Sequence, residues 1–278
     1  MSVPARELPV VIIDGTGGWA RWWADLRDYR GALQSLAWRN LRSRYKQSLL
    51  GVLWALLQPA VQVGVFTLLF GVLAHIPSDG VPYALFALAG LLPWNFFSKV
   101  VSEGAQSLVV NQNIITKLFF PRVYLVIAAG ASAAVDGAVT LALLLGAMAW
   151  YGVWPGPHAW LVLPALLGVV LLSFGMAALL AALNARWRDV QHTLPFLLQV
   201  GMLATPVIYR ASFVPGKWRW LLALNPLTGL IEVFRSAMLG LPLPDRRLVM
   251  LSLFFSVTAT LGGVWLFRRT ESIIVDVV

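Results

Sequence analysis

The sequence predicts an all-α integral membrane protein with six transmembrane helices, and three observations support this fold class. First, 59% of the 278 residues are hydrophobic and only 12% are charged, whereas an ordinary soluble domain has about 25% charged residues. Second, apolar stretches of about 20 residues recur along the chain, and at ~1.5 Å rise per residue such a helix crosses a hydrocarbon core of roughly 30 Å. Third, basic residues cluster beside the ends of these stretches, as they do at the flanks of membrane spans.

Residues 1–48 are predicted to form a cytoplasmic arm that carries an amphipathic interfacial helix. From residue 28 onward, apolar side chains recur at helical spacing, at Leu33, Leu36, Ala37, Leu41 and Tyr45. Basic side chains lie mostly on the other faces, at Arg39, Arg42, Arg44 and Lys46. A helix with this division of residues lies along a membrane surface.

Residues 49–278 are interpreted as one transmembrane domain. Its predicted spans cover about residues 49–74, 83–101, 123–150, 160–183, 194–209 and 248–267. Between the second and third spans, residues 102–121 turn polar and are expected to form a cytoplasmic loop that carries a short helix.

Residues 210–247 are too polar and too often broken by proline for one crossing. Within them, residues 218–239 are interpreted as two half-helices that meet at Asn225-Pro226. Such a hairpin enters the membrane and returns on the same, extracytoplasmic side.

The distribution of Lys and Arg predicts that both termini are cytoplasmic, because these residues favour the cytoplasmic side of short loops. With that orientation, 15 of the 21 basic residues lie inside and six outside. All six outside residues fall in residues 210–247, which we expect to be translocated despite their charge.

Composition also excludes several functions. The absence of cysteine excludes disulfides, thiolate metal sites and a cysteine nucleophile. Although the net charge is +9, the basic residues do not line one soluble face, so no nucleic-acid partner is expected. The histidines, His75, His158 and His192, lie in separate polar connections, which predicts no metal site. No catalytic residue, no cofactor on this chain and no cleaved signal peptide are expected.

Several separated motifs resemble the ABC-2 type permeases that export polysaccharides. They follow the family's order over roughly residues 19–267: Tyr29-Arg30, Trp38-Arg39-Asn40-Leu41-Arg42, residues 44–51 with Trp54 and Gln58-Pro59, residues 90–97, Asn113-Ile114-Ile115 with Lys117 and Phe120-Pro121-Arg122, Arg188-Asp189-Val190, Asn225-Pro226 and Phe234-Arg235.

The resemblance implies the membrane subunit of an ABC exporter of lipid-linked, O-antigen-like polysaccharide in the bacterial cytoplasmic (inner) membrane. It further implies a homodimer, in contact with membrane lipids, that joins two ATPase subunits, which bind ATP and Mg²⁺. The sequence agrees, because it has no G-x-x-x-x-G-K-[ST] phosphate loop of its own. Permeases for teichoic acid, capsular glycan or a drug or lipid are the alternatives within the same family.

The resemblance also implies roles for particular residues. The residues expected to contact the ATPase are Asn111, Asn113, Ile114, Lys117, Phe120 and Arg122. The first and fifth spans of both protomers would line the glycan path, with aromatic rings facing the sugars. The candidates for lining this path are Trp54, Gln58, Gln62, Phe66, Phe70 and Asp136.

Each polar or aromatic candidate also has a structural interpretation. The basic set at residues 39–46 could hold a lipid diphosphate, or it could attract anionic lipid in general. The two glutamines could face a hydrated channel or join helices by a hydrogen bond. Asp136 has no basic partner in its own span. It could take part in the function, or it could accept a hydrogen bond that is only structural. The aromatic residues could stack on sugars or pack and anchor the spans.

The predicted hairpin carries the candidates for an outer gate, Asn225, Glu232 and Arg235. Since Glu232 and Arg235 are three residues apart on one half-helix, they could also form no more than a local pair.

Two other classes of membrane protein are weighed against export. A membrane enzyme would need acidic, histidine or metal-binding residues gathered at an interface, but only Asp136 lies deep in a predicted span. A secondary transporter would show broken helices at matching positions of two internal repeats. Only the last third of this chain contains a broken hairpin.

Overall fold

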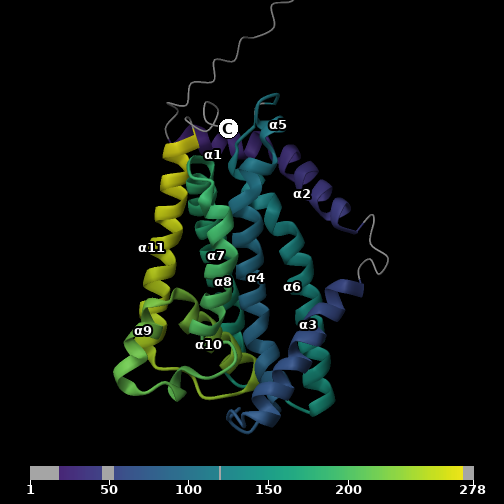
Figure 1. Ribbon diagram of the computed structural model, residues 1–278, viewed down its shortest axis with the longest axis vertical. Helices are drawn as coiled ribbons and strands as arrows, with labels where there is room; N and C mark the ends of the chain where they lie inside the picture. The colour runs from purple at the N-terminus through teal and green to yellow at the C-terminus, as the bar shows by residue number, and fades with distance from the viewer. Residues whose placement is uncertain (1–18, 46–52, 119, 272–278) are drawn as a thin grey trace, which may run out of the picture.

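The computed structural model describes residues 19–45, 53–118 and 120–271, and the regular secondary structure of these residues is helical, with no strand (Figure 1). The long helices α4, α6, α7 and α11 run side by side as a bundle. The short helix α5 (Gln112–Ile115) lies at one end of this bundle and α9 (Arg219–Leu224) at the other. We call these the α5 end and the α9 end.

Five helical segments in the described residues are long and apolar enough to cross a membrane. They are α3 (Leu53–Phe66) with η1 (Thr67–Leu73), α4 (Tyr83–Val110), α6 (Val123–Tyr151), η2 (Ala159–Leu161) with α7 (Val162–Arg186), and α11 (Arg246–Glu271). They match five of the six predicted spans, apart from residues 49–52, which lie outside the described part.

The predicted fifth span, residues 194–209, is matched only in part. The helix α8 covers Asp189–Ala204, and the chain leaves helical conformation after it. Its 16 residues correspond to about 24 Å of helix, less than the ~30 Å of a hydrocarbon core.

The prediction of a polar loop over residues 102–121 is wrong for the first half of this range, because α4 continues without interruption to Val110. The polar side chains of this extension, such as Glu103 and Gln106, line a cavity between helices. After Asn111, only the single turn α5 remains of the predicted loop helix.

Two helices precede the first span at the α5 end. The predicted interfacial helix is α2 (Arg30–Tyr45), which packs on α6 through the buried Leu36. Asn40 fixes this contact, since its Nδ2 donates to the carbonyl of Ala128 at 3.1 Å. The preceding α1 (Trp19–Asp28) was not expected as a helix.

The predicted break at Asn225-Pro226 is present between α9 and α10 (Pro226–Leu239). The Asn225 side chain accepts from the backbone N–H of Leu227 at 3.0 Å, and Pro226 occupies the first helical position. Both are favourable ways to begin a helix. Two short turns, η3 (Ala211–Phe213) and η4 (Gly216–Trp218), connect α8 to α9.

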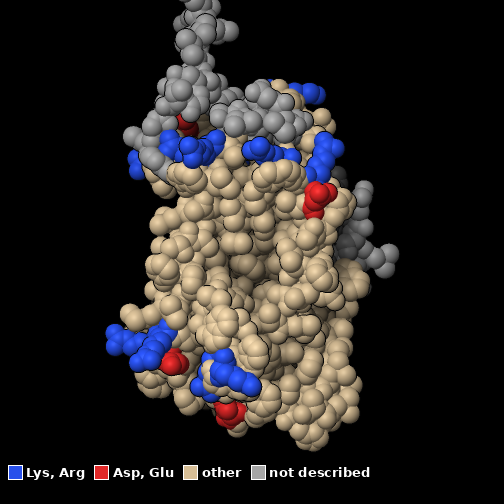
Figure 2. Space-filling view, turned by 60° about the vertical axis from the view of Figure 1, so that its left-hand side comes forward, with Lys and Arg blue, Asp and Glu red and all other residues tan. Residues whose placement is uncertain are grey.

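Charged residues and strongly exposed tryptophans lie toward the ends of the bundle. On the face in Figure 2, Lys, Arg, Asp and Glu gather at the two ends and leave a wide uncharged belt between them. Strongly exposed tryptophans, Trp150, Trp154 and Trp160, flank the connection between α6 and α7. Tryptophan favours the interface between lipid and water, so this connection has the composition of a membrane interface, and the uncharged belt has that of a lipid-facing surface.

Candidate functional site

A polar cavity of about 640 Å³ lies between α2, α3, α4 and α6. The helix α4 contributes Asn95, Lys99, Glu103 and Gln106, whose spacing of three or four residues places them on one face. Of the predicted path residues, Gln58 and Asp136 line this cavity. The cavity therefore gathers polar groups from four helices inside an otherwise apolar bundle.

An ionic cluster stands on the wall of the cavity. Lys99 on α4 donates to Asp136 on α6, and its Nζ lies 3.8 Å from Oε1 of Glu103. Glu103 in turn accepts from the hydroxyl of Ser132 at 2.6 Å. Asp136 thus has a cationic partner on the neighbouring helix, which its own span could not reveal.

Arg39 connects the interfacial helix to the loop expected to contact the ATPase. Its Nη2 donates to Oδ1 of Asn111 at 2.7 Å, and both residues line the cavity. Asn111 also donates to the carbonyl of Ser107 on the last turn of α4. Arg42 is exposed and does not line the cavity, and the Arg44 side chain and Lys46 lie outside the described residues. Of the two described members of the predicted basic set, Arg39 lines the cavity and Arg42 does not.

The other predicted coupling residues divide into two groups. Asn113 and Lys117 are exposed and Ile114 is half-buried at the tip of the α5 end. Phe120 is buried in the core of this end, and the backbone N–H of Arg122 donates to Oε1 of Glu271 at 3.0 Å. Asn113, Ile114 and Lys117 are therefore accessible to a partner, whereas Phe120 and Arg122 hold α6 against α11.

The remaining path candidates on α3 and η1 do not line the cavity. Gln62 accepts from the side-chain amide of Asn95 at 3.0 Å, which is the helix-to-helix bond foreseen as its structural alternative. Phe66 and Phe70 stack edge to face at 5.6 Å and pack against the core. Trp54 is half-exposed on α3.

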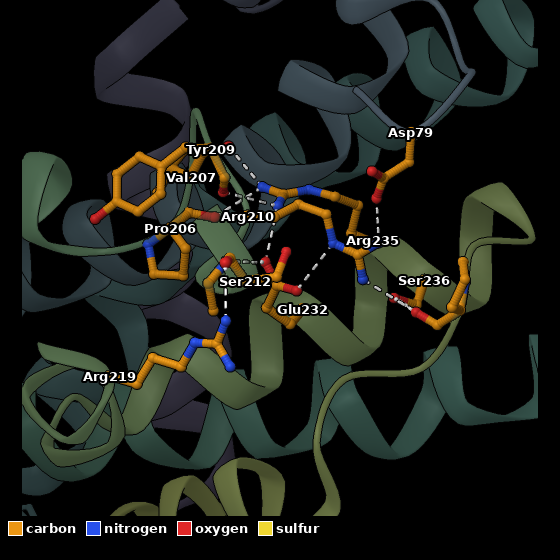
Figure 3. A network of polar contacts seen from close by, with 12 residues as sticks. Asp79, Pro206, Val207, Tyr209, Arg210, Ser212, Arg219, Glu232, Arg235 and Ser236 are labelled. Carbon is orange, nitrogen blue, oxygen red and sulfur yellow. Dashed lines mark hydrogen bonds and ion pairs between the residues drawn. The ribbon is translucent and has the colours of Figure 1, made fainter. Parts of the chain in front are cut away.

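A second polar site, the hairpin ion network, lies at the α9 end (Figure 3). Glu232 and Arg235 on α10 are 2% and 1% exposed, and they form the pair foreseen from their spacing, at 3.2 Å. Arg235 also donates to the carbonyls of Pro206 at 2.9 Å, Val207 at 2.5 Å and Tyr209 at 3.3 Å. These bonds tie α10 to the chain that follows α8.

Arg210 extends the network, and sequence reasoning missed it. Its Nε lies 3.5 Å from Oε2 of Glu232, and its Nη1 pairs with Asp79 in the loop before α4. Burial lowers the pKa of Arg210, but the hydrogen bond to Asp79 and the two carboxylates raise it above its ordinary value. Arg210 is therefore a permanent cation between two carboxylates.

Glycine at position 90 makes room for Arg235. A Cβ there would lie 2.2 Å from Nη2 of Arg235 and 2.4 Å from the carbonyl oxygen of Val207. The guanidinium also stands 4.0 Å from the ring centre of Phe86 on α4. Asn225, the third gate candidate, donates to Oγ1 of Thr205 at 2.7 Å and lies outside these ion pairs.

The lining of the polar cavity and the ion pairs of the hairpin ion network include no histidine or cysteine. The described residues contain no group of three or more histidine, cysteine or acidic side chains that could hold a metal. Both sites join separate segments of the chain through ion pairs and hydrogen bonds.

The comparisons with known proteins give one family. The model of the ABC-2 type transporter family matches residues 31–239, which include both polar sites. The O-antigen export system permease protein RfbA of Myxococcus xanthus is 33% identical over 251 residues, 89% of this chain and 96% of that protein. A Klebsiella pneumoniae protein of the same name is 24% identical over 84% of this chain and 89% of its own. The Escherichia coli polysialic acid transport protein KpsM is 25% identical over 86% of this chain and 93% of its own.

Proposed function

This chain belongs to the ABC-2 type transporter family, and from that premise we propose that it is the permease subunit of an ABC exporter that moves lipid-linked polysaccharide across the bacterial cytoplasmic membrane. The relative at 33% identity, which spans nearly the whole chain and is named an O-antigen export permease, is the observation that carries this proposal. The relative named for polysialic acid transport supports a capsular glycan as the alternative substrate. Teichoic acid and drug or lipid substrates are further alternatives.

The proposed topology has six crossings, with the α5 end and both termini in the cytoplasm. In Figure 1, α7 ends at the α5 end and α11 begins at the α9 end, so the chain between them must cross the bundle. The short α8 and the residues after it are the segment available for that crossing. The excess of Lys and Arg in segments that meet the α5 end supports its cytoplasmic placement. In this topology α9 and α10 are a re-entrant hairpin on the far side.

We propose that two copies of the chain assemble around a path for the glycan. Few side chains of α3 and α8 are buried within one protomer: Ala55, Pro59 and Val63 on α3, and Leu194 on α8. The central α4, in contrast, is buried along most of its length. Two apolar, sparsely covered helices of one protomer suit an interface with a second copy.

Two ATPase subunits, each a separate polypeptide, would supply the energy by binding ATP and Mg²⁺. On this chain, the exposed Asn113 and Lys117 would receive their movement at the α5 end. Asn111 and Arg39 would pass it to α4 and α2, because the bond between them joins both helices at this corner. At the α9 end, the hairpin ion network would hold the exit closed until α4 and α10 shift relative to each other.

The proposal is tested by purifying the full-length chain with candidate ATPase partners. We expect a stable complex of two permease and two ATPase chains, whose ATP hydrolysis responds to this subunit and to lipid-linked glycan. Cells that lack the chain should retain the glycan inside. Transport that runs on an ion gradient without ATP would contradict the proposal.

A further inference from the structure

A second cavity, of about 660 Å³, lies at the α9 end beside the hairpin ion network. Its walls come from the η3 and α9 segments, from α10 and from the first turns of α11. Three arginines line it, Arg210, Arg219 and Arg247, together with the carboxylates Glu232 and Asp245. Its volume is within the ~300–1,000 Å³ typical of ligand pockets. We call it the arginine pocket.

Two of the three guanidinium groups in the arginine pocket have no carboxylate partner in the described residues. Arg210 is engaged by Asp79 and Glu232. Arg219 instead donates only to backbone carbonyls, those of Ser212 at 3.0 Å and Val214 at 3.1 Å, and Figure 3 shows it reaching toward Ser212.

The side chain of Arg247 makes no hydrogen bond or ion pair within the described part of the chain. Its backbone N–H donates to Oδ1 of Asp245 at 2.9 Å, which fixes the start of α11. The pocket therefore holds two guanidinium groups that are available to an anion: that of Arg219, which two backbone carbonyls orient, and that of Arg247, which has no partner in the described residues. Guanidinium groups bind phosphate oxygens well, because their donors match the geometry.

The surface beside the pocket is apolar. Trp220 lines the pocket and is 58% exposed, and Leu248 and Leu251 carry the wall onto α11. Further along α11, Phe254 and Leu261 are also largely exposed. Since α11 is one of the five candidate spans, this apolar track leads from the pocket into the hydrocarbon core.

We propose that the arginine pocket binds the phosphodiester headgroup of an anionic phospholipid in the leaflet at the α9 end. Arg219 and Arg247 contact the phosphate oxygens, Trp220 packs beside the glycerol, and the acyl chains lie along α11. The net positive charge of the lining favours an anionic over a zwitterionic lipid. The pocket shares Arg210 and Glu232 with the hairpin ion network, but Arg219 and Arg247 take no part in the ion pairs of that network. The α11 wall of the pocket and α3 lie on opposite sides of the protomer in Figure 1.

The test is lipid binding by the purified full-length chain in a neutral detergent. Native mass spectrometry would measure the dissociation constant of short-chain phosphatidylglycerol, with short-chain phosphatidylcholine and inorganic phosphate as comparison probes. We expect Arg219→Gln with Arg247→Gln to weaken phosphatidylglycerol binding about tenfold or more, as the loss of charge-assisted hydrogen bonds requires. The single variant Arg247→Gln, whose side chain supports nothing in the fold, should already weaken it severalfold.

The matched control is Lys217→Gln with Arg246→Gln, which removes the same charge at the same end from residues that do not line the pocket. This control should change the dissociation constant by less than about twofold. Equal loss in both double variants would overturn the proposal in favour of general attraction to charge. Binding of inorganic phosphate as tight as that of the lipid, or no binding of phosphatidylglycerol by the unmodified chain, would overturn it as well.

Discussion

Replacing Gly90 with alanine is the sharpest test of the hairpin ion network. The added Cβ would lie 2.2 Å from a guanidinium nitrogen of Arg235 and 2.4 Å from the carbonyl oxygen of Val207. Neither atom can move freely, because Arg235 is held by Glu232 and by three carbonyls, and it is buried. The methyl group must therefore displace the guanidinium or separate α4 from the chain after α8.

The cost follows from two effects. Overpacking a close-packed interior costs about 1–3 kcal/mol, and losing one hydrogen bond of a charged group costs about 1.5–3 kcal/mol more. The higher helix propensity of alanine offsets about 1 kcal/mol of this loss of stability. We therefore expect Gly90→Ala to lower the free energy of unfolding by about 1.5–5 kcal/mol and the Tm by about 3–20 °C.

Thermal unfolding in detergent, followed by tryptophan fluorescence, measures this effect. Gly146→Ala on α6 is the matched control, because nothing lies within 4 Å of its added Cβ; it should raise stability slightly. A double-mutant cycle with Arg235→Leu should show that Gly90→Ala costs less once the guanidinium is gone. If Gly90→Ala and Gly146→Ala unfolded at the same temperature, Arg235 could not be packed against position 90 as described.

Three further outcomes are expected. Lys99→Met removes the cationic partner of Asp136 and should lower the free energy of unfolding by about 1–3 kcal/mol, since both side chains keep some exposure. Adding Asp136→Leu should restore part of the lost stability. If the losses of the two single variants were additive in thermal unfolding, the pairing would be contradicted. The double variant Asn113→Ala with Lys117→Ala should keep its Tm, but its stimulation of the partner's ATPase should fall about fivefold or more. If this stimulation were unchanged, Asn113 and Lys117 would not belong to the docking surface. Arg39→Gln should lower unfolding free energy by about 1 kcal/mol through the lost bond to the end of α4, which urea titration would measure.

Hydropathy predicts the long helices well because lipid requires every span to be apolar and long. It places the third span at residues 123–150, and α6 covers Val123–Tyr151. The same signal fails at α4, where Glu103 and Gln106 turn one face of the helix toward an internal cavity. Averaged hydropathy cannot distinguish such a face from a polar loop. At α8 the helix Asp189–Ala204 covers only part of the predicted span 194–209.

The candidate sites were predictable only where partners are close in sequence. The spacing of Glu232 and Arg235 predicts their pair, because residues three apart share a helix face. The partners of Arg210 and Lys99 come from other segments: Asp79 is 131 residues from Arg210, and Asp136 is 37 residues from Lys99. No periodicity in one sequence indicates such pairs.

The two polar sites are connected by one helix, and this has a consequence for the proposed function. At one end α4 packs Gly90 against Arg235, and at the other its C-cap Asn111 bonds to Arg39. Between them it is buried against α6, α7 and α10. Because α4 is one uninterrupted helix from Tyr83 to Val110, movement received at the α5 end would be carried along it toward Gly90. Such a shift would strain the contact at Gly90, so Arg235 would respond at the exit to events at the ATPase side.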